Sequence, residues 1–239
     1  MAQLGNSPPV KSFDRGVFIL YTIINIGKQI NKGRNVVTKQ RRERERAEVR
    51  QQILLAAREI ASQEGWQAVT VRKVAERIEY SHAAIYAYFD NKKALLFALL
   101  IEGFALLRDE LRRAQRVPGA PEDLLQRIAL AYWNFAHAHP ELYQVMNGLD
   151  GVPFGTAQTP TEARESFAQL QEAVVRVLEQ SADLSHIDVN REVDMFWAAL
   201  HGLVSLSMAG RLAGDQQRAM ELVVSTSEHF SAAWRAKFH

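Results

Sequence analysis

Cysteine is absent from this chain of 239 residues, and no apolar run in it is long enough to cross a membrane. The absence of cysteine excludes disulfides, thiolate zinc sites and cysteine nucleophiles, and it is consistent with the reducing cytoplasm. The longest apolar run covers residues 17–26, whereas a membrane-spanning helix needs about 20 apolar residues. No small-residue cleavage site follows that run, so we expect a cytoplasmic protein with neither membrane contact nor export.

Motifs for catalysis and metal binding are also missing. The sequence has no nucleophile elbow, no glycine-rich phosphate loop and no paired-carboxylate motif. His137 and His139 are two residues apart and would lie on different faces of a helix, whereas helical metal-ligand pairs lie three or four residues apart. We therefore expect no enzyme activity, no metal and no cofactor. A metal or proton sensor remains the alternative for the seven histidines.

The charged residues are distributed unevenly along the chain. Residues 1–37 have five basic residues and one acidic residue, and residues 38–95 have 12 basic and eight acidic residues, which gives +4 for each part. Residues 96–239 have 12 basic and 18 acidic residues, a net charge of −6. Only the first 95 residues are therefore suited to a polyanion such as DNA. A chance imbalance on solvated surfaces would give the same pattern.

Residues 1–38 show no helical periodicity and no turn chemistry that links them to the following segment, so we expect a disordered basic extension. The alternative is that translation starts at Val37. Residues 32–34, Lys-Gly-Arg, can be encoded by purines alone, as in a ribosome-binding site, and a GTG codon at Val37 could then initiate. Intact-mass measurement of the native protein would decide, because a chain that retains Met1 excludes the later start.

Helical periodicity begins at Lys39 and continues to the carboxyl terminus. It predicts an all-α protein with about nine helices and no strand. Residues 39–99 would form a three-helix amino-terminal domain, and residues 100–239 a larger helical domain. The predicted helices cover residues 39–64, 71–78, 82–89, 92–116, 121–138, 140–146, 161–182, 189–212 and 215–237.

Residues 70–89 carry two short helices with a tight turn between them, the arrangement of a helix-turn-helix. Thr70 and Ser81 are placed as the amino-terminal caps of the two helices. In the second helix Ile85 and Phe89 are four residues apart and would point inward. Small and polar side chains would then remain on the outward face, which in such motifs enters the major groove of DNA.

The segment TVRKVAERIEYSHAAIYAYFDNKKALL, residues 70–96, resembles the signature of the TetR family of repressors. The positions in step with the family pattern are Thr70, Val71, Val74, Ala75, Ser81, Ile85, Tyr86, Phe89, Lys92 and Leu95. The resemblance implies that the chain binds double-stranded DNA through this segment.

The resemblance also implies a role for each contact residue. Phosphates would be held by Thr70, Ser81, Tyr86, Tyr88 and Lys92. Purine edges would accept hydrogen bonds from Arg72 and His82, and the methyl group of Ala83 would contact a thymine methyl. One position departs from the pattern, because the family usually has glycine where this chain has Glu79. A non-glycine residue in a left-handed conformation costs about 1–2 kcal/mol.

Small residues recur along residues 189–212, at Ala198, Ala199, Gly202, Ser205, Ser207, Ala209 and Gly210. They permit close helix approach, so we expect this helix to form a dimer interface. The last helix would contribute an apolar stripe made of Leu222, Val223, Phe230 and Trp234. The two helices of each subunit would make a four-helix interface, as the family resemblance also implies. The alternative is that they pack within one subunit.

The carboxy-terminal domain resembles the Trp-His-Gly type of TetR domain in residues 135–143 and 196–202. This resemblance implies a small-molecule effector, and aromatic and polar residues on converging helices would line its site. The predicted ligand-binding residues are Trp133, His137, Tyr143, Met146, Phe167, Trp197 and His201, with Met208 as a further candidate. We expect a homodimeric, ligand-relieved repressor that binds a palindromic operator. The alternatives are a ligand-independent DNA-binding protein and a helical enzyme.

Overall fold

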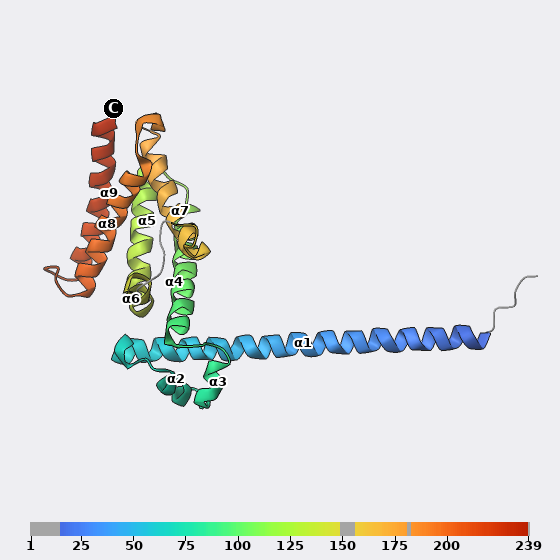
Figure 1. Ribbon diagram of the computed structural model, residues 1–239. Coiled ribbons are helices and arrows are strands. Elements are labelled where there is room, and N and C mark those ends of the chain that lie inside the picture. Colours follow the sequence, from blue (N-terminus) through green and yellow to red (C-terminus); the bar gives the residue numbers. More distant parts are fainter. Residues whose placement is uncertain (1–14, 149–155, 181–182, 239) are drawn as a thin grey trace, which may run out of the picture. The chain divides into compact units, whose positions relative to one another are not determined.

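The computed structural model describes residues 15–148, 156–180 and 183–238, with backbone only for residues 15–38 (Figure 1). The α-helices are α1 (Arg15–Glu64), α2 (Val71–Arg77), α3 (His82–Tyr86), α4 (Lys92–Gln115), α5 (Pro121–Ala138), α6 (Pro140–Gly148), α7 (Thr161–Leu178), α8 (Val189–Met208) and α9 (Gln216–Phe238). Two 3₁₀ turns are η1 (Trp66–Ala68) and η2 (Leu184–His186). These described ranges contain nine α-helices and no strand, which confirms the predicted fold class.

The chain divides into two units, residues 1–52 and residues 53–239. In the first unit, residues 15–38 are helical where the sequence analysis expects a disordered extension. Residues 15–64 contain no proline that would interrupt the helical backbone hydrogen bonds of α1. Residues 39–52 form an exposed, highly charged stretch of α1 with i,i+4 ion pairs such as Arg41–Glu45.

In the second unit, the end of α1 packs with α2 and α3 around a small apolar core. Its fully buried side chains come from Ile53, Ala57, Ile60, Val69, Val74 and Ile85. The apolar residues of the last turns of α1 recur at three- and four-residue intervals, and they line the face that this core covers. This arrangement leaves the other faces of α2 and α3 exposed.

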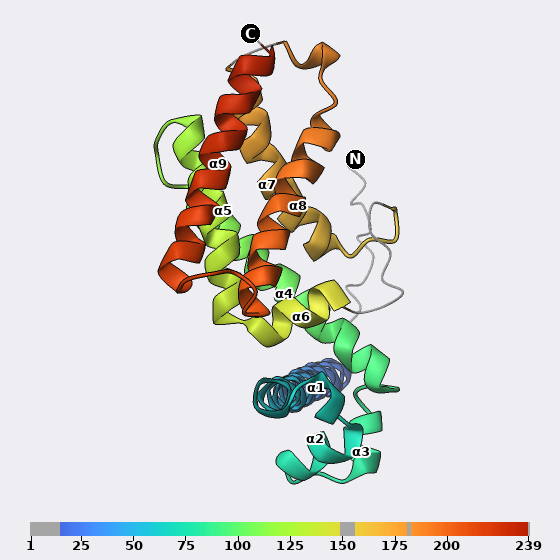
Figure 2. The same ribbon diagram turned by 90° about the vertical axis from the view of Figure 1, so that its left-hand side faces the viewer.

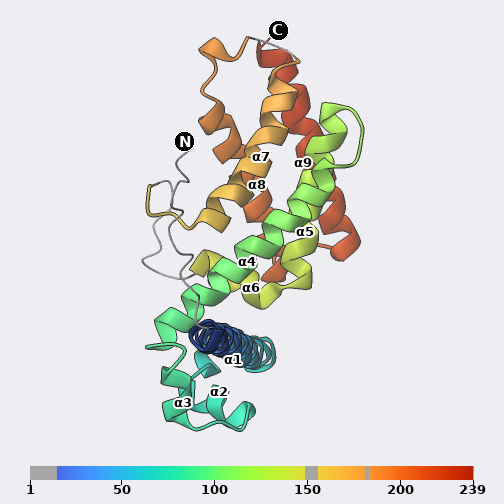
Figure 3. The ribbon, with the colours of Figure 1, turned by 90° about the vertical axis from the view of Figure 1, so that its right-hand side faces the viewer.

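Helices α4, α5, α7, α8 and α9 form the larger bundle of the second unit (Figures 2 and 3). Helix α4 begins at Lys92, after the turn that follows α3, and continues into this bundle across the domain boundary predicted at residue 99. The short helix α6 packs against α4 and α5 at the end of the bundle nearest α2 and α3 (Figure 2). A single residue, His139, separates α5 from α6.

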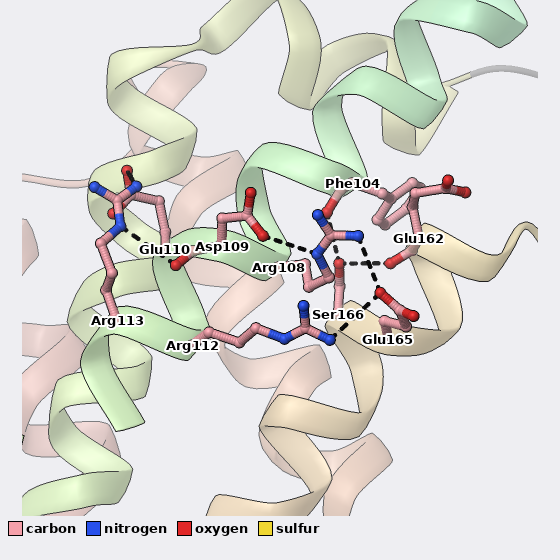
Figure 4. Close-up of polar contacts among 9 residues, drawn as sticks. All are labelled: Phe104, Arg108, Asp109, Glu110, Arg112, Arg113, Glu162, Glu165 and Ser166. Carbon is pink, nitrogen blue, oxygen red and sulfur yellow. Dashed lines mark hydrogen bonds and ion pairs between the residues drawn. The ribbon is translucent and has the colours of Figure 1, made fainter. Parts of the chain in front are cut away.

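Polar contacts fasten the carboxyl half of α4 to α7 (Figure 4). The hydroxyl of Ser166 donates to the Phe104 carbonyl at 2.8 Å, and Arg108 donates to Glu165 at 3.0 Å. Arg112 forms a longer ion pair of 3.5 Å with the same carboxylate. This half of α4 is therefore a fixed part of the bundle.

The apolar stripe of α9 packs within the subunit. Trp234 and Val223 are buried, and the rings of Phe230 and Trp234 both contact Phe196 of α8. The indole N–H of Trp234 also donates to Glu192 at 2.9 Å. For Phe230 and Trp234 this arrangement supports the intrasubunit alternative, because both rings already contact Phe196 of α8. None of the helices in the described part of the chain is long and apolar enough to span a bilayer.

Candidate DNA interface and ligand site

The two helices of the helix-turn-helix begin at the predicted caps. The Thr70 hydroxyl accepts from the backbone N–H of Lys73 at 3.1 Å, and the Ser81 hydroxyl accepts from that of Ala84 at 3.2 Å. Each hydroxyl keeps its own hydrogen for a further acceptor, and both residues are exposed. The caps thus fix the start of each helix and leave an O–H available for a phosphate.

The turn between α2 and α3 is closed by a left-handed residue. Glu79 has a φ of 58°, the left-handed backbone that glycine adopts at this position in the family. The N–H of Tyr80 bonds to the Ala75 carbonyl at 2.9 Å and that of Glu79 to the Glu76 carbonyl at 3.3 Å, which together form a Schellman motif. The turn therefore has a left-handed residue at Glu79, the conformation that glycine adopts most easily.

Helix α3 presents its small and polar side chains to solvent. His82, Ala83 and Tyr86 are exposed, whereas Ile85 and Phe89 are buried as predicted and Tyr88 is half-buried. The helix is shorter than predicted and ends at Tyr86, and residues 87–89 continue it as a turn. The exposed face has no bulky aliphatic side chain, so it can approach the base edges of a major groove closely.

The basic side chains of this region have partners within the chain. Arg72 donates to Glu76 at 2.8 Å, and Lys73 forms an ion pair with Glu64. Lys92 donates to the carbonyl of Trp66 at 3.0 Å, so it joins the start of α4 to η1. The prediction assigned Lys92 to a phosphate. Its ammonium group has further N–H donors, but the bond seen here holds α4 to η1 and involves no phosphate.

Five rings from four helices form a continuous row in the larger domain, here called the ring row. The contacting pairs are Phe167–Trp197, Trp197–His201, His201–Tyr143 and Tyr143–Tyr132, with centroid separations of 6.3, 6.2, 5.7 and 5.9 Å. The helices that contribute are α7, α8, α6 and α5. Four of the seven predicted ligand residues thus belong to the ring row.

Hydrogen bonds connect the polar end of the ring row. The Tyr143 hydroxyl lies 2.6 Å from His201 Nδ1 and 3.2 Å from the Tyr132 hydroxyl, and His201 Nε2 lies 3.4 Å from the Ser205 hydroxyl. Burial raises the pKa of both tyrosines and lowers the pKa of His201. Both phenols therefore keep their protons near neutral pH, and the tautomer of the neutral imidazole sets the direction of the Tyr143–His201 hydrogen bond.

The other predicted ligand residues lie beside the ring row or outside it. Trp133 and His137 stack at 3.9 Å, and His137 Nε2 lies 3.3 Å from the hydroxyl of Ser207 on α8. Met146 packs against α4, where a Cβ built on Gly103 would stand 2.5 Å from its sulfur. Its place is thus in the contact of α6 with α4.

The prediction omitted Tyr132, Ser205 and Ser207, although all three take part in these contacts. One signal was present in the sequence, because Ser205 follows His201 by four residues on the same helix face. Tyr132 gave no signal of its own, since its partner Tyr143 belongs to another helix.

Arg58 of α1 joins three elements in a part-buried cluster, here called the Arg58 junction. It donates to Glu102 of α4 at 2.9 Å and to Glu141 of α6 at 2.8 Å, and it lies 3.3 Å from Nδ1 of His139. The indole N–H of Trp66 donates to the Glu141 carbonyl at 3.0 Å. Helix α6 is therefore bonded to the helix-turn-helix region through both its side chain and its backbone. The sequence analysis did not identify this cluster.

Metal binding finds no support in this arrangement. His137 and His139 contact separate partners, Ser207 and Arg58. No group of three or more histidine or acidic side chains that could hold a metal occurs within the described ranges.

Two family models match the chain. Residues 53–99 match the model described as bacterial regulatory proteins of the tetR family, and residues 125–227 match the tetracyclin repressor-like C-terminal domain. The HTH-type transcriptional repressor KstR of Rhodococcus jostii is 32% identical over 148 residues, which are 55% of this chain and 68% of KstR. The chain belongs to the TetR family of transcriptional regulators. The matches do not confirm the Trp-His-Gly subtype.

Two further proteins are similar to this chain. The nucleoid occlusion factor SlmA of Haemophilus influenzae is 29% identical over 137 residues, which are 55% of this chain and 61% of SlmA. The chain thus spans about six tenths of the length of SlmA. A protein of unknown function from Rhodococcus sp. RHA1 has a similar structure, with a TM-score of 0.66 and 28% identity over 80% of this chain and 95% of that one.

Proposed function

We propose that this TetR-family protein is a cytoplasmic, ligand-relieved repressor that binds a palindromic operator as a homodimer. One observation carries the proposal: helix α6 is hydrogen-bonded both to the helix-turn-helix region and to the ring row. Glu141 contacts Arg58 and Trp66 beside the helix-turn-helix, and two residues later Tyr143 contacts His201 in the ring row. A ligand that moves Tyr143 therefore also acts on the DNA-binding helices.

On the DNA side, α3 would enter the major groove with His82 and Ala83 toward the bases. Tyr86, which is 53% exposed, and the Thr70 and Ser81 hydroxyls would hold phosphates. Arg72 would exchange its exposed partner Glu76 for a base or phosphate, and Tyr88 and Lys92 would support the phosphate contacts from half-buried positions.

On the ligand side, an effector bound at the ring row would favour a dimer whose two α3 helices are wrongly spaced for successive major grooves, about 34 Å apart. Trp133, His137 and Met146 would shape the surroundings of that site. Only a ligand that binds the two states with different affinities can shift them. A coupling of about 1–3 kcal/mol would reduce operator affinity by about 5- to 150-fold.

The dimer would form through the outward side of α8. Met195 and Leu206 are 48% and 41% exposed there, and a Cβ built on Gly202 between them would meet no atom within 4 Å. An exposed apolar stripe with a central glycine allows a second helix to approach closely.

The first test of this function is operator binding. We expect the purified protein to bind an inverted repeat close to its own gene, with an affinity that falls steeply as the salt concentration rises. Tyr86→Phe should weaken binding to all sequences alike, whereas His82→Ala and Arg72→Ala should relax preference at single base pairs by about 1–3 kcal/mol. Asn134→Ala, an exposed change on α5, is the control. Unchanged affinity and footprint in all three variants would exclude this interface.

The second test separates a ligand-relieved repressor from a ligand-independent DNA-binding protein. In a reporter strain, Trp197→Ala should repress as the parent does and fail to respond to compounds that induce the parent. If operator binding holds but no compound or cell extract alters it, the ligand-independent alternative is correct. We assign no catalytic role to any residue.

A further inference from the structure

We propose that the effector is uncharged and largely apolar, and that it carries a hydroxyl or carbonyl group that joins the hydrogen bonds of Tyr143, His201 and Ser205. This inference rests on the proposed function and names the chemical class of its ligand. It follows from the composition of the ring row, from the hydrogen bonds along it and from its partial exposure.

The composition of the ring row disfavours an ionic ligand. Within the described ranges, no lysine, arginine, aspartate or glutamate side chain makes a hydrogen bond or ion pair with any of the five rings. A carboxylate bound against these rings would lose water and find no cation, which is strongly unfavourable in a low-dielectric site. A neutral polar group loses much less on transfer.

The hydrogen bonds show where a polar group can join. The Tyr143 hydroxyl, the His201 ring and the Ser205 hydroxyl form a chain of hydrogen bonds through Nδ1 and Nε2, and a neutral imidazole accepts at one nitrogen and donates at the other. The Ser205 hydroxyl also bonds to the Tyr143 phenol, so both hydroxyls belong to this chain. A ligand oxygen can accept from either hydroxyl once that hydroxyl turns away from its partner in the chain, and a ligand hydroxyl can in addition donate to Tyr143.

The other end of the ring row suits an apolar body. Trp197 is 38% exposed and meets the half-buried Phe167 edge to face at 6.3 Å. On a helical wheel, Trp197, His201 and Ser205 share one flank of α8, away from the stripe of Met195, Gly202 and Leu206. The exposed part of this row is thus distinct from the proposed dimer surface.

Asp194 is the acid that could contradict this conclusion, because it is exposed on the same flank of α8, one turn before Trp197. It makes the site a possible acceptor of a cation. The test therefore compares four probes with one ring system: 2-acetylnaphthalene is neutral with a carbonyl, 2-ethylnaphthalene is apolar, 2-naphthoate is anionic and 1-(2-naphthyl)ethylamine is cationic.

The readout uses the four tryptophans of the chain, labelled with 5-fluorotryptophan and assigned by single Trp→Phe variants. We expect 2-acetylnaphthalene to shift the ¹⁹F signal of Trp197 saturably and to leave that of Trp234 in the α8–α9 contact unchanged. Its affinity should exceed that of each other probe by at least about tenfold, the difference that one good hydrogen bond can supply. Replacing both hydroxyls, by Tyr143→Phe with Ser205→Ala, should remove this advantage over 2-ethylnaphthalene, and Asp194→Asn should leave it unchanged.

Equal or tighter binding of 2-naphthoate, or an amine affinity that depends on Asp194, would overturn the proposal. So would the absence of any saturable Trp197 shift with 2-acetylnaphthalene. Operator binding by the unliganded protein is measured in parallel on the same samples. Loss of the ligand preference with intact operator binding rejects this inference alone, whereas intact ligand preference without operator binding rejects the proposed function.

Discussion

Glu79 concentrates backbone strain at one residue of the helix-turn-helix. Its φ of 58° costs a non-glycine residue about 1–2 kcal/mol, whereas glycine adopts it freely but loses more entropy on folding. We expect Glu79→Gly to raise the free energy of unfolding by up to about 1 kcal/mol and to raise the melting temperature. The change also removes an acid beside the DNA, so operator affinity should rise.

The control for this variant is Glu76→Gly in the preceding helix. There the backbone is right-handed, so glycine can only lose stability. A melting temperature that falls in both variants would show that the Schellman turn depends on the Glu79 side chain.

His201 predicts a dependence of stability on pH. Burial lowers the pKa of its imidazole below the ordinary 6.5. Tyr143 of α6 is the titratable group bonded to it, and Tyr143 in turn bonds to Tyr132 of α5. As the pH falls below about 6.5, the unfolded chain takes up the proton first, and stability is lost until the pH reaches the lowered pKa. Urea denaturation between about pH 8 and pH 5 should show this loss in the parent.

The matched variant is His201→Gln, which keeps a polar side chain that does not titrate. Its free energy of unfolding should fall less between those two pH values than that of the parent. Equal slopes would mean that His201 titrates alike in both states.

At the scale of elements, the short helix α6 makes two specific polar contacts, one through Glu141 with Arg58 and one through Tyr143 with His201. The side chains of Arg58 and Glu141 are 18% and 9% exposed, so removal of one partner leaves a part-buried charge without its main counter-ion. We expect Arg58→Met to lower the free energy of unfolding by about 3 kcal/mol, and a second change, Glu141→Met, to restore part of the loss. Urea denaturation of the four proteins in this double-mutant cycle gives the coupling energy.

The exposed pair Arg72–Glu76 provides the comparison cycle. Both side chains are solvated, so their coupling should be much smaller than that of Arg58 with Glu141. Similar coupling in the two cycles would argue against a special role for the Arg58 junction.

The elements themselves could be predicted from sequence because their signals are local. Caps at Thr70 and Ser81, and apolar positions such as Ile85 and Phe89, determine their own helices within a few residues. The junction could not be predicted, since Arg58 and Glu141 are 83 residues apart and ion-pair partners carry no pattern at that separation. The ring row could be predicted in part. Most of its residues were predicted from residue type and helical spacing, but their contacts depend on how four helices pack together.

Lys92 shows the same limit within the helix-turn-helix. Its match to the family pattern indicated a phosphate contact, whereas its bond to the Trp66 carbonyl depends on η1, which no local pattern indicated. Two basic neighbours in the first turn of α4 look alike in sequence, and only the fold separates half-buried Lys92 from exposed Lys93.

At the scale of the whole molecule, the proposed dimer depends on the open surface around Gly202. We expect Gly202→Leu to convert the protein to a monomer and to weaken operator binding, because a leucine side chain would prevent close approach of a second α8. The fold of the subunit should persist, since that position is open and leucine favours a helix more than glycine does. Analytical ultracentrifugation measures the change.

Ala168→Leu, at an exposed position of α7, should leave the oligomeric state unchanged. If Gly202→Leu also sediments as the parent does, the dimer uses another surface, or the protein is not a dimer.

The connection of α5 to α6 by His139 alone sets a rule for insertions and deletions. Because this linker is one residue long, one residue gained or lost there would displace Glu141 and Tyr143 together from their partners on α1 and α8. Substitutions on either side can be compensated one at a time, but a change of length cannot. In the divergence of this protein from its nearest orthologues, the spacing between Tyr132 and Tyr143 should therefore persist longer than the identity of the residues between them.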